Sequence, residues 1–301
     1  MGALVGGDCQ RAALFICKLR GGSQPILVEG TNGVLYVLKF SDNPQGPNVP
    51  FNEVAGAELF HACGLPVPGW DPLLLTDEFI DSNRDCWPVV EAEPRRPRAG
   101  LCFASRFLGS QNQQLIEILP GSAFNRIRNR AHFWLAWFID ICCEHIDNRQ
   151  AIFLRDSEGW LHASFIDSGH LLSGARGDSK PNFWSPRYLD PRIYNGISSL
   201  DIAKYRRVLF TLNADAVFAR ILEMPQDWQL PSAVAALTRC LSRIANRQFA
   251  NVIWEMLQKE CTPGSETGRD GHQVEAGDEG RALLQLGIPA RRREEPGHIF
   301  S

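Results

Sequence analysis

Short apolar runs separated by turn residues dominate the start of the chain. Residues 12–19 read AALFICKL, residues 26–30 read ILVEG, and residues 34–40 read VLYVLKF. The sequence RGGSQP separates the first two runs, and Thr-Asn-Gly separates the second from the third. Apolar runs bounded by Gly, Pro and Asn are typical of strands, and the Asn-Gly pair is a hairpin signal. The first 40 residues therefore predict three consecutive strands.

A helical pattern follows a break in the chain. Three prolines interrupt residues 43–50, and residues 51–63 (FNEVAGAELFHAC) then show helical periodicity up to Gly64, with Pro66 just beyond. A glycine after the last periodic residue and a proline shortly after it are stop signals for a helix. We therefore expect one helix over residues 51–63.

The next fifty residues mix strand-like and loop-like segments. Residues 71–76 (DPLLLT) and 101–109 (LCFASRFLG) have the apolar content of strands. Residues 81–100 contain three prolines and four arginines, which predicts a loop or an insertion. Residues 110–114 (SQNQQ) are expected to form a polar connector.

Helical patterns prevail beyond about residue 115. Residues 130–144 (RAHFWLAWFIDICCE) place large apolar side chains at spacings of three and four residues, which predicts a helix buried along one broad face. Residues 151–166 contain two short apolar runs that predict a small strand pair. From about residue 262 Gly, Glu, Asp and Arg prevail, which predicts a disordered tail with at most a short helix at EGRALLQLG. Later helices are expected over residues 201–212, 214–223 and 231–259.

Strands gathered in the first third and helices in the remainder predict an α+β protein with two lobes. We assign residues 1–109 to a small antiparallel β-rich N-lobe with one helix and residues 110–260 to a larger, mainly α-helical C-lobe. Residues 261–301 form the expected disordered tail. Ligands usually bind in clefts between lobes, so a site is expected near the junction.

Composition and charge are those of an ordinary globular protein. Of the 301 residues, 44% are hydrophobic and 22% are charged, which is compatible with a sizeable core. The formal net charge of −3 predicts no direct binding of nucleic acid and no attraction to an anionic membrane. No stretch approaches the roughly 18 apolar residues of a membrane-spanning helix.

The cysteines indicate the redox environment. The nine cysteines form no Cys-x-x-Cys pair, which argues against a zinc or redox site. Their odd number and their positions in apolar runs favour reduced thiols that pack as small hydrophobic groups. We therefore expect a cytoplasmic protein.

The candidate chemistry begins with a flexible turn and a lysine. Gly21, Gly22 and Ser23 lie between the first two strands, where backbone N–H groups and a hydroxyl can hold phosphate oxygens. A Gly-Gly pair is equally a feature of an ordinary hairpin turn. Lys39 lies among apolar residues of the third strand, where a lysine is costly unless it is paired. The alternative is a lysine on an edge strand that reaches solvent.

Carboxylates complete the candidate set. Glu53, 14 residues after Lys39, can pair with it or stabilise the first turn of the helix, and Glu58 is a second candidate. Asp147, in HIDNRQAIFL, can orient a hydroxyl and accept its proton. Asp167, in FIDSGH, ends an apolar strand and suits a Mg²⁺ ion. Each aspartate alone could be a solvated loop carboxylate, but the ordered set is typical of phosphoryl transfer from ATP.

These segments resemble the HipA-like kinases. The resemblance covers about residues 15–255 and rests on two blocks, GGSQPILVEGTNGVLYVLKF…FNEVAGAELFHACGLPVP and HIDNRQAIF…FIDSGH. The family contains bacterial serine/threonine-kinase-like proteins with a two-lobed, protein-kinase-like fold. The resemblance therefore implies ATP and Mg²⁺ as cofactors and a protein as the substrate. It indicates neither the identity of that substrate nor the oligomeric state.

The resemblance also implies a role for each matching residue. Lys39 looks like the lysine that contacts the nucleotide, and Glu53 looks like its partner on the helix. Asp147 matches the aspartate of the catalytic loop, and Asp167 matches the metal-binding aspartate. The GGSQP turn occupies the position that covers the phosphates. The hinge between the lobes and its contact with adenine would fall in SRFLG, with Arg106 and Phe107.

One position departs from the family. The catalytic loop of the family carries an asparagine five residues after the aspartate as a second Mg²⁺ ligand, whereas this chain has Ile152 there. A hydrocarbon side chain cannot bind a hard cation, so Asn148 or a water replaces the ligand, or one metal site is lost. The kinase interpretation therefore stands beside two alternatives, a pseudokinase that binds a nucleotide or a partner, and a phosphotransferase for a small molecule or lipid.

Overall fold

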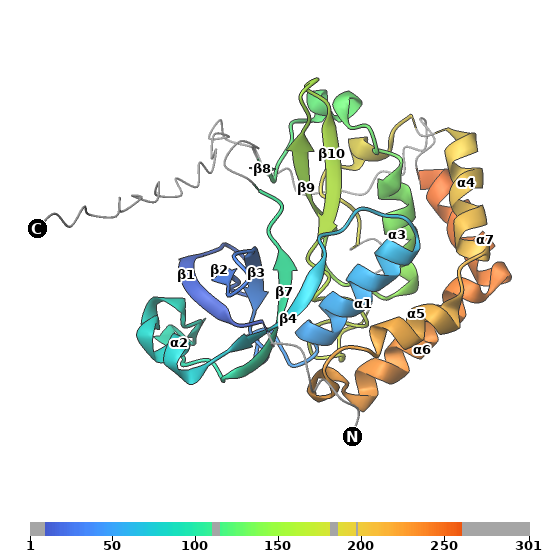
Figure 1. Ribbon diagram of the computed structural model, residues 1–301. Coiled ribbons are helices and arrows are strands. Elements are labelled where there is room, and N and C mark those ends of the chain that lie inside the picture. Colours follow the sequence, from blue (N-terminus) through green and yellow to red (C-terminus); the bar gives the residue numbers. More distant parts are fainter. Residues whose placement is uncertain (1–9, 110–114, 181–185, 197, 261–301) are drawn as a thin grey trace, which may run out of the picture.

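A computed structural model describes residues 10–109, 115–180, 186–196 and 198–260. Its architecture is mixed α+β, with antiparallel strands in the N-terminal part and helices in the C-terminal part, as the sequence predicts (Figure 1). The connector over 110–114 and the expected tail over 261–301 lie outside the described residues.

The N-terminal part is built on a five-stranded sheet of order β1-β2-β3-β7-β4, in which all neighbouring strands are antiparallel. The three strands expected in the first 40 residues are present and adjacent. β3 lies between β2 and β7, so Lys39 belongs to an inner strand and not to an edge. The strands are β1 (Ala12–Lys18), β2 (Ile26–Gly30), β3 (Leu35–Lys39), β4 (Trp70–Leu75) and β7 (Gly100–Arg106).

The segment predicted as a loop over residues 81–100 holds short regular elements. A helix begins just before it because the Thr76 side chain accepts a hydrogen bond from the Phe79 backbone N–H and caps the first turn. A two-stranded hairpin follows and covers the β1–β2 turn, where the Gln24 side chain bonds to the backbone of Val89. These elements are α2 (Asp77–Ser82), a 3₁₀ helix (Arg84–Cys86), β5 (Val89–Val90) and β6 (Glu93–Pro94).

Helix α1 (Val49–Ala62) connects the sheet to the helical part of the molecule. Pro50 lies in its first turn, where a missing N–H is tolerated, and Gly64, with φ +74°, follows its end. The helix begins two residues earlier than the sequence predicts, so Glu53 lies in its second turn and cannot act as a first-turn helix cap. Helix α1 packs against α5 and α6 of the C-terminal part.

Within the described residues, the C-terminal part combines a small sheet of order β10-β9-β8 with five α-helices. The single helix expected over 231–259 is divided at Asn246, whose backbone is extended. Its side chain accepts hydrogen bonds from the N–H groups of Gln248 and Phe249, so it ends one helix and caps the next. The elements are β8 (Leu115–Ile116), α3 (His132–Cys142), β9 (Gln150–Arg155), β10 (Leu161–Ile166), α4 (Ser199–Phe210), α5 (Ala214–Ile221), α6 (Pro231–Ala245) and α7 (Arg247–Glu260), with 3₁₀ helices at Gly121–Arg126, Pro191–Tyr194 and Gln226–Trp228.

Two hydrophobic cores stabilise these parts. The smaller core fills one face of the five-stranded sheet, and the larger one surrounds α3. Helix α3 is buried on all sides from Phe133 to Cys142, which exceeds the single broad face that its periodicity predicts. The apolar side chains of α1, such as Phe51 and Phe60, belong to the larger core. Helix α1 is therefore anchored to the helical part, while its Asn52 and Glu53 side chains face the turn after β10 and Lys39 of the sheet.

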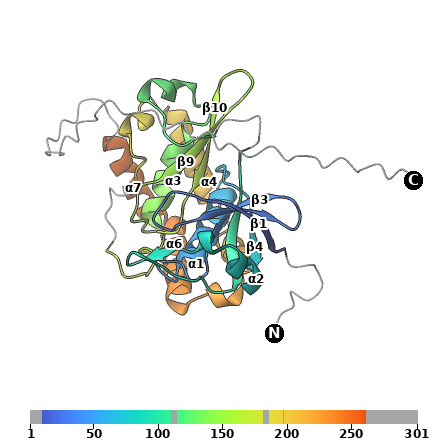
Figure 2. The same cartoon turned by 90° about the vertical axis from the view of Figure 1, so that its left-hand side faces the viewer.

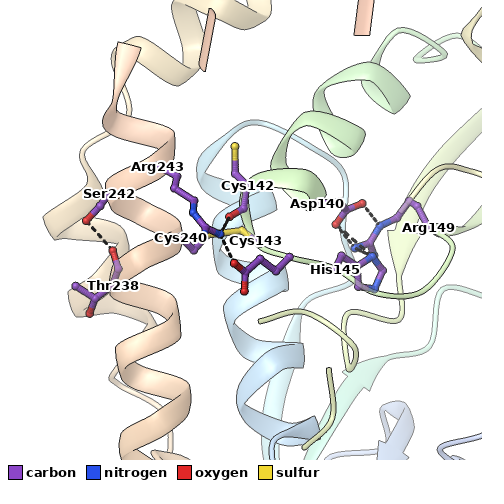
Figure 3. The surroundings of a disulfide bond; sticks show 10 residues. Asp140, Cys142, Cys143, His145, Arg149, Thr238, Cys240, Ser242 and Arg243 are labelled. Atoms are coloured by element: carbon purple, nitrogen blue, oxygen red, sulfur yellow. Dashed lines mark hydrogen bonds and ion pairs between the residues drawn. A yellow bond between two sulfur atoms is a disulfide. The ribbon is translucent and has the colours of Figure 1, made fainter. Parts of the chain in front are cut away.

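Cys143 and Cys240 form a disulfide between the end of α3 and helix α6, contrary to the expectation that the cysteines are reduced (Figure 3). Their Cα atoms lie 4.9 Å apart, a separation that a disulfide requires and that arises because α3 and α6 pack together. Cys17, Cys63, Cys86, Cys102 and Cys142 are free thiols. Across the described part of the chain, every helix is too short or too polar to cross a membrane.

Candidate active site

Three charged side chains from distant parts of the sequence meet where the sheet, α1 and the turn after β10 come together. The Lys39 Nζ atom lies 2.5 Å from Glu53 Oε1 and 2.7 Å from Asp167 Oδ1. The Lys39 and Glu53 side chains are 8% and 6% exposed, whereas Asp167 is 26% exposed. One ammonium thus holds a buried carboxylate on one side and a carboxylate open to solvent on the other.

The charges in this cluster stabilise each other against the cost of burial. Burial alone lowers the pKa of Lys39, but Glu53 and Asp167 outweigh it and raise this pKa above its ordinary value. Burial raises the pKa of Asp167, but the Lys39 ammonium and the Arg149 guanidinium lower it below its ordinary value. Lys39 is therefore a cation and Asp167 an anion at neutral pH, as required for contacts with phosphate oxygens and with a metal ion.

Helix α1 holds the turn that carries Asp167. The buried Asn52 side chain donates from its Nδ2 atom to the carbonyl oxygens of Gly169 (2.9 Å), Leu171 (2.7 Å) and Gly174 (3.3 Å). The Glu53 carboxylate also accepts a hydrogen bond from the Ser168 backbone N–H at 3.3 Å. Asn52 lies beside the predicted Glu53, but the sequence shows no signal that distinguishes it.

A buried ion pair supports the same turn from the opposite side. Arg149 donates to both oxygens of Asp140 on α3, at 2.8 and 2.5 Å (Figure 3). It also donates to the Ile166 carbonyl at 2.9 Å. Both side chains are at most 1% exposed. The Arg149 guanidinium also lies 4.8 Å from the centre of the Phe60 ring, so it contacts α1. Sequence analysis missed this pair, although an aspartate in the apolar run WLAWFIDICC indicates a paired charge.

His145 is a further buried member of this network. Its Nδ1 atom lies 3.3 Å from Arg149 Nη2 and 3.5 Å from Asp140 Oδ1. Burial, reinforced by the charge of Arg149 and by His170, lowers its pKa well below the ordinary value, so the ring is neutral at neutral pH. The guanidinium can only donate, so Nδ1 is the acceptor in the contact with Arg149, while the Nε2 atom is buried without a hydrogen-bond partner among the described residues.

Asp147 lies in the bend between α3 and β9. Its Oδ1 atom accepts a hydrogen bond from the Asn148 backbone N–H at 2.7 Å, and the side chain is half-buried. Ile152 lies in β9, opposite Ser164 of β10, and it is also half-buried. Gln150, which the sequence did not single out, donates from Nε2 to Asp167 Oδ2 at 2.9 Å.

The glycine-rich turn lies at the same end of the sheet as Lys39. Ile26, which begins β2, pairs with Leu38, so the preceding turn is adjacent to the end of β3. Gly21 and Gly22 are exposed, and Gly21 has φ +132°. Ser23 is buried, and its carbonyl accepts from the Asn43 side chain. The backbone of the two glycines can therefore approach a ligand, whereas the Ser23 side chain faces the protein.

The predicted hinge residues lie farther along the sheet. Arg106 pairs with Tyr36, three residues before Lys39 on β3, which corresponds to about 10 Å of strand. Its side chain binds the Asp71 carboxylate at 3.1 Å, and its backbone N–H donates to the Gly69 carbonyl at 2.7 Å, so both groups are already engaged within the protein. The Phe107 N–H donates to the Leu35 carbonyl at 2.8 Å.

The second glutamate candidate on α1 lies outside the site. Glu58 accepts a hydrogen bond from the Trp70 indole N–H at 2.8 Å and lies 3.4 Å from Arg220 of α5. It therefore joins α1 to neighbouring elements and is separate from the Lys39 cluster.

The site occupies the junction of the two parts of the molecule. Lys39 comes from β3 and Glu53 from α1, while Asp147 precedes β9 and Asp167 follows β10, both at the open end of the β9–β10 hairpin. The hairpin lies above β1 and β3 in both perpendicular views (Figures 1 and 2). An ammonium, a partly exposed carboxylate and a second carboxylate in a neighbouring loop can bind a phosphorylated ligand with a cation.

The fold of the chain is similar to that of a solved kinase structure. The crystal structure of a Helicobacter pylori proinflammatory kinase, CtkA, matches with a TM-score of 0.50 and 14% sequence identity, covering 81% of this chain and 94% of that chain. The Golgi casein kinase and its Mn/ADP-bound form each match with a TM-score of 0.47 and 12% identity over 84% of this chain and 76% and 75% of theirs. No protein-family model and no curated protein matches the chain. The chain thus has a two-lobed, protein-kinase-like α+β fold.

Proposed function

We propose that this protein is an ATP- and Mg²⁺-dependent kinase of the HipA-like type that transfers the γ-phosphoryl group to a hydroxyl, a serine or threonine of a protein. The contact of Lys39 with both Glu53 and Asp167 carries the proposal. Phosphoryl transfer needs a cation on the phosphates, a carboxylate for the metal and a group that positions the acceptor. In this cluster a cation, the Lys39 ammonium, and a carboxylate, that of Asp167, lie 2.7 Å apart.

The oxygen donors around Asp167 fit Mg²⁺. In phosphoryl-transfer sites this ion is held by one or two carboxylates, substrate phosphates and waters. The described residues contain no cluster of three or more His, Cys, Asp and Glu side chains, but they place the Asp167 carboxylate beside the Gln150 amide. The carboxylate oxygens of Asp167 are hard ligands and suit Mg²⁺ better than a softer metal. When bound, the ion would neutralise charge on the β- and γ-phosphates.

The remaining steps belong to the side chains of the chain itself. Lys39, held by Glu53, binds phosphate oxygens through its ammonium group. The exposed backbone of the Gly21–Gly22 turn covers the phosphates from the sheet side. Asp147 orients the acceptor hydroxyl and takes its proton as the oxygen–phosphorus bond forms, while the bond between the γ-phosphorus and the ADP oxygen breaks.

Ile152 favours a second candidate function. A pseudokinase with this fold would bind a nucleotide or a protein partner without efficient transfer, because Ile152 cannot act as a metal ligand. Lys39, Glu53 and Asp167 serve nucleotide binding in both cases. Only a transfer assay separates these functions.

The test uses purified full-length protein with labelled ATP and Mg²⁺. We expect transfer to a protein substrate or to the chain itself, and loss of at least a hundredfold in the Asp147→Asn variant, the usual scale of general-base catalysis. Asp147→Asn should keep the rise in melting temperature caused by nucleotide, whereas Asp167→Ala should lose its Mg²⁺-dependent part. The exposed Asp215→Asn on α5 is the matched control and should behave like the wild type.

Each outcome of these assays supports a different conclusion. A nucleotide-dependent rise in melting temperature without transfer supports the pseudokinase. The absence of both refutes the nucleotide site. If Asp147→Asn removes binding while Asp167→Ala removes only transfer, the two aspartates have the opposite roles.

A further inference from the structure

Gln150 is the side chain of β9 that reaches the candidate metal-binding aspartate. It begins the strand, and its Nε2 atom lies 2.9 Å from Asp167 Oδ2. Gln150 pairs with Ile166, the residue before Asp167, whereas Ile152 pairs with Ser164, two residues farther from it. The register of the hairpin therefore places Gln150 next to Asp167 and moves Ile152 away from it.

The two oxygens of Asp167 have different partners. Oδ1 accepts from the Lys39 ammonium, and Oδ2 accepts from Gln150. A carboxamide carries an N–H₂ donor and a carbonyl acceptor at nearly the same position, and rotation about its terminal bond exchanges them. After this rotation the Gln150 carbonyl oxygen and Asp167 Oδ2 lie side by side. Both are hard oxygen ligands of the kind that divalent cations such as Mg²⁺ prefer.

Exposure to solvent allows this exchange. Gln150 is exposed and Asp167 is partly exposed, so the amide can rotate, and a cation with its waters can approach from solvent. Arg149, the preceding residue, is fully buried and bound to Asp140, which fixes the backbone from which Gln150 projects. A fixed backbone with a rotatable terminal amide is suited to respond to a cation.

We propose that Gln150, through its amide oxygen, is the second protein ligand of the divalent cation held by Asp167. Gln150, at the start of β9, supplies the neutral oxygen ligand that Ile152, two residues further along the strand, cannot supply. This inference rests on the proposed function because it assumes a cation–nucleotide complex at Asp167. It makes an intact cation site compatible with Ile152.

The test measures the binding of Mn²⁺ in the presence of a non-hydrolysable ATP analogue, by electron paramagnetic resonance of free Mn²⁺. We expect Gln150→Leu to raise the Kd of Mn²⁺ about tenfold or more, the scale seen when groups around a bound metal are removed. Binding of the analogue without divalent cation should be unchanged, which shows that the fold and the Lys39 cluster are intact.

Gln150→Glu separates a ligand from a positioning residue. Glutamate at neutral pH cannot donate a hydrogen bond to Asp167, but it offers an oxygen to a cation. A ligand role predicts that Gln150→Glu binds Mn²⁺ at least as tightly as the wild type. A role limited to the hydrogen bond predicts that Gln150→Glu and Gln150→Leu are equally impaired, which would overturn the proposal.

Two further variants locate the ligand. Ile152→Asn in the Gln150→Leu background should not restore Mn²⁺ binding if position 150 is the ligand position. Loss of Mn²⁺ binding in Asn148→Ala with wild-type affinity in Gln150→Leu would assign the ligand to Asn148 and refute the proposal. If Mn²⁺ binds through Gln150 but the protein transfers no phosphoryl group, the kinase function is refuted and the assignment of Gln150 as a ligand stands. No Mn²⁺ binding by the wild type would refute both.

Discussion

Gly56 of α1 and Ser168 of the turn after β10 lie so close that a Cβ atom added at Gly56 would be 2.2 Å from the Ser168 hydroxyl oxygen and 2.3 Å from its Cβ atom. This approach brings α1 near enough for Asn52 to bond the turn and for Glu53 to reach Lys39. The absence of one side chain therefore determines how closely the helix supports the site.

Gly56→Ala should displace the turn that carries Asp167. In an unconstrained helix this change would stabilise the protein by up to about 1 kcal/mol, but here we expect a loss of about 1–3 kcal/mol from overpacking. The rise in melting temperature with Mg²⁺ and nucleotide should shrink as well. Denaturant unfolding and thermal shift measure the two effects. Ser168→Gly in the same chain removes the two shortest of these contacts and leaves the one to the flexible end of Leu171, at 2.9 Å, so it should restore most of both. A stabilised single variant would contradict this account.

Arg149→Met should destabilise the protein strongly because it leaves the Asp140 carboxylate buried without its partner. The expected loss in the free energy of unfolding is about 3–5 kcal/mol. Arg149→Met combined with Asp140→Leu should recover a large part of this loss, since the double variant buries no charge at this place. Urea unfolding of the two variants provides the measurement. A double variant no more stable than Arg149→Met would show that the bond to the Ile166 carbonyl, and not the buried charge, dominates.

Stability should fall as the pH decreases through the range where His145 titrates in the unfolded chain. The pKa of folded His145 lies well below its ordinary value, because of burial and the nearby Arg149 and His170. Below about pH 6.5 the unfolded chain takes up a proton that the folded chain does not, so stability is complete above this pH and is lost below it. The slope is up to about 1.4 kcal/mol per pH unit.

His145→Gln should flatten this pH dependence, although the variant itself is less stable. Chemical unfolding at several pH values between 5 and 7.5 (a range of roughly one unit either side of the ordinary histidine pKa) measures the slope. His61, exposed at the end of α1, is the control, and His61→Gln should leave the slope unchanged. An identical slope in His145→Gln and the wild type would mean that His145 is not the group responsible.

The disulfide should contribute to stability under oxidising conditions. Cys143 and Cys240 are separated by 97 residues, and closing a loop of this size lowers the entropy of the unfolded chain by an equivalent of about 4.7 kcal/mol. Cys240→Ser should lose this contribution, and a reductant should weaken the wild type but not the variant. Denaturant unfolding with and without dithiothreitol tests this, with Cys17→Ser as the control because Cys17 is a free thiol. A wild type insensitive to reductant would show that the bond does not form in solution.

The same bond lies close to the candidate site. The Cys143 carbonyl accepts from the Leu172 N–H at 2.8 Å, and the Glu144 carbonyl accepts from the Ser173 N–H at 3.1 Å. Arg243 of α6 also binds Glu144 at 2.5 Å. Helix α6 therefore supports the segment that follows Asp167 through a short chain of contacts.

Local sequence patterns predicted most elements because neighbouring residues control them. The alternation of apolar and turn residues located β1, β2 and β3, and Gly64 marked the end of α1. Local patterns were weaker where one side chain redirects the backbone. Asn246 divides α6 from α7 by capping the second helix, and Thr76 starts α2 just before a segment rich in proline and arginine. Such capping bonds depend on the conformation of one side chain, which the composition of the segment does not indicate.

The sequence by itself determined the order of the elements and the candidates Lys39, Glu53, Asp147 and Asp167, because a charged residue in an apolar run and an aspartate at a strand end are local signals. Only the tertiary structure decided which of these side chains meet. Lys39 and Asp167 are 128 residues apart, and the packing of α1 against the C-terminal helices brings them within 2.7 Å. The register of β9 and β10, and not the spacing along the chain, places Gln150 beside Asp167 where the sequence drew attention to Ile152. Such contacts follow from packing and strand pairing. These bring together residues that are far apart in the sequence, so no local pattern can indicate that they meet.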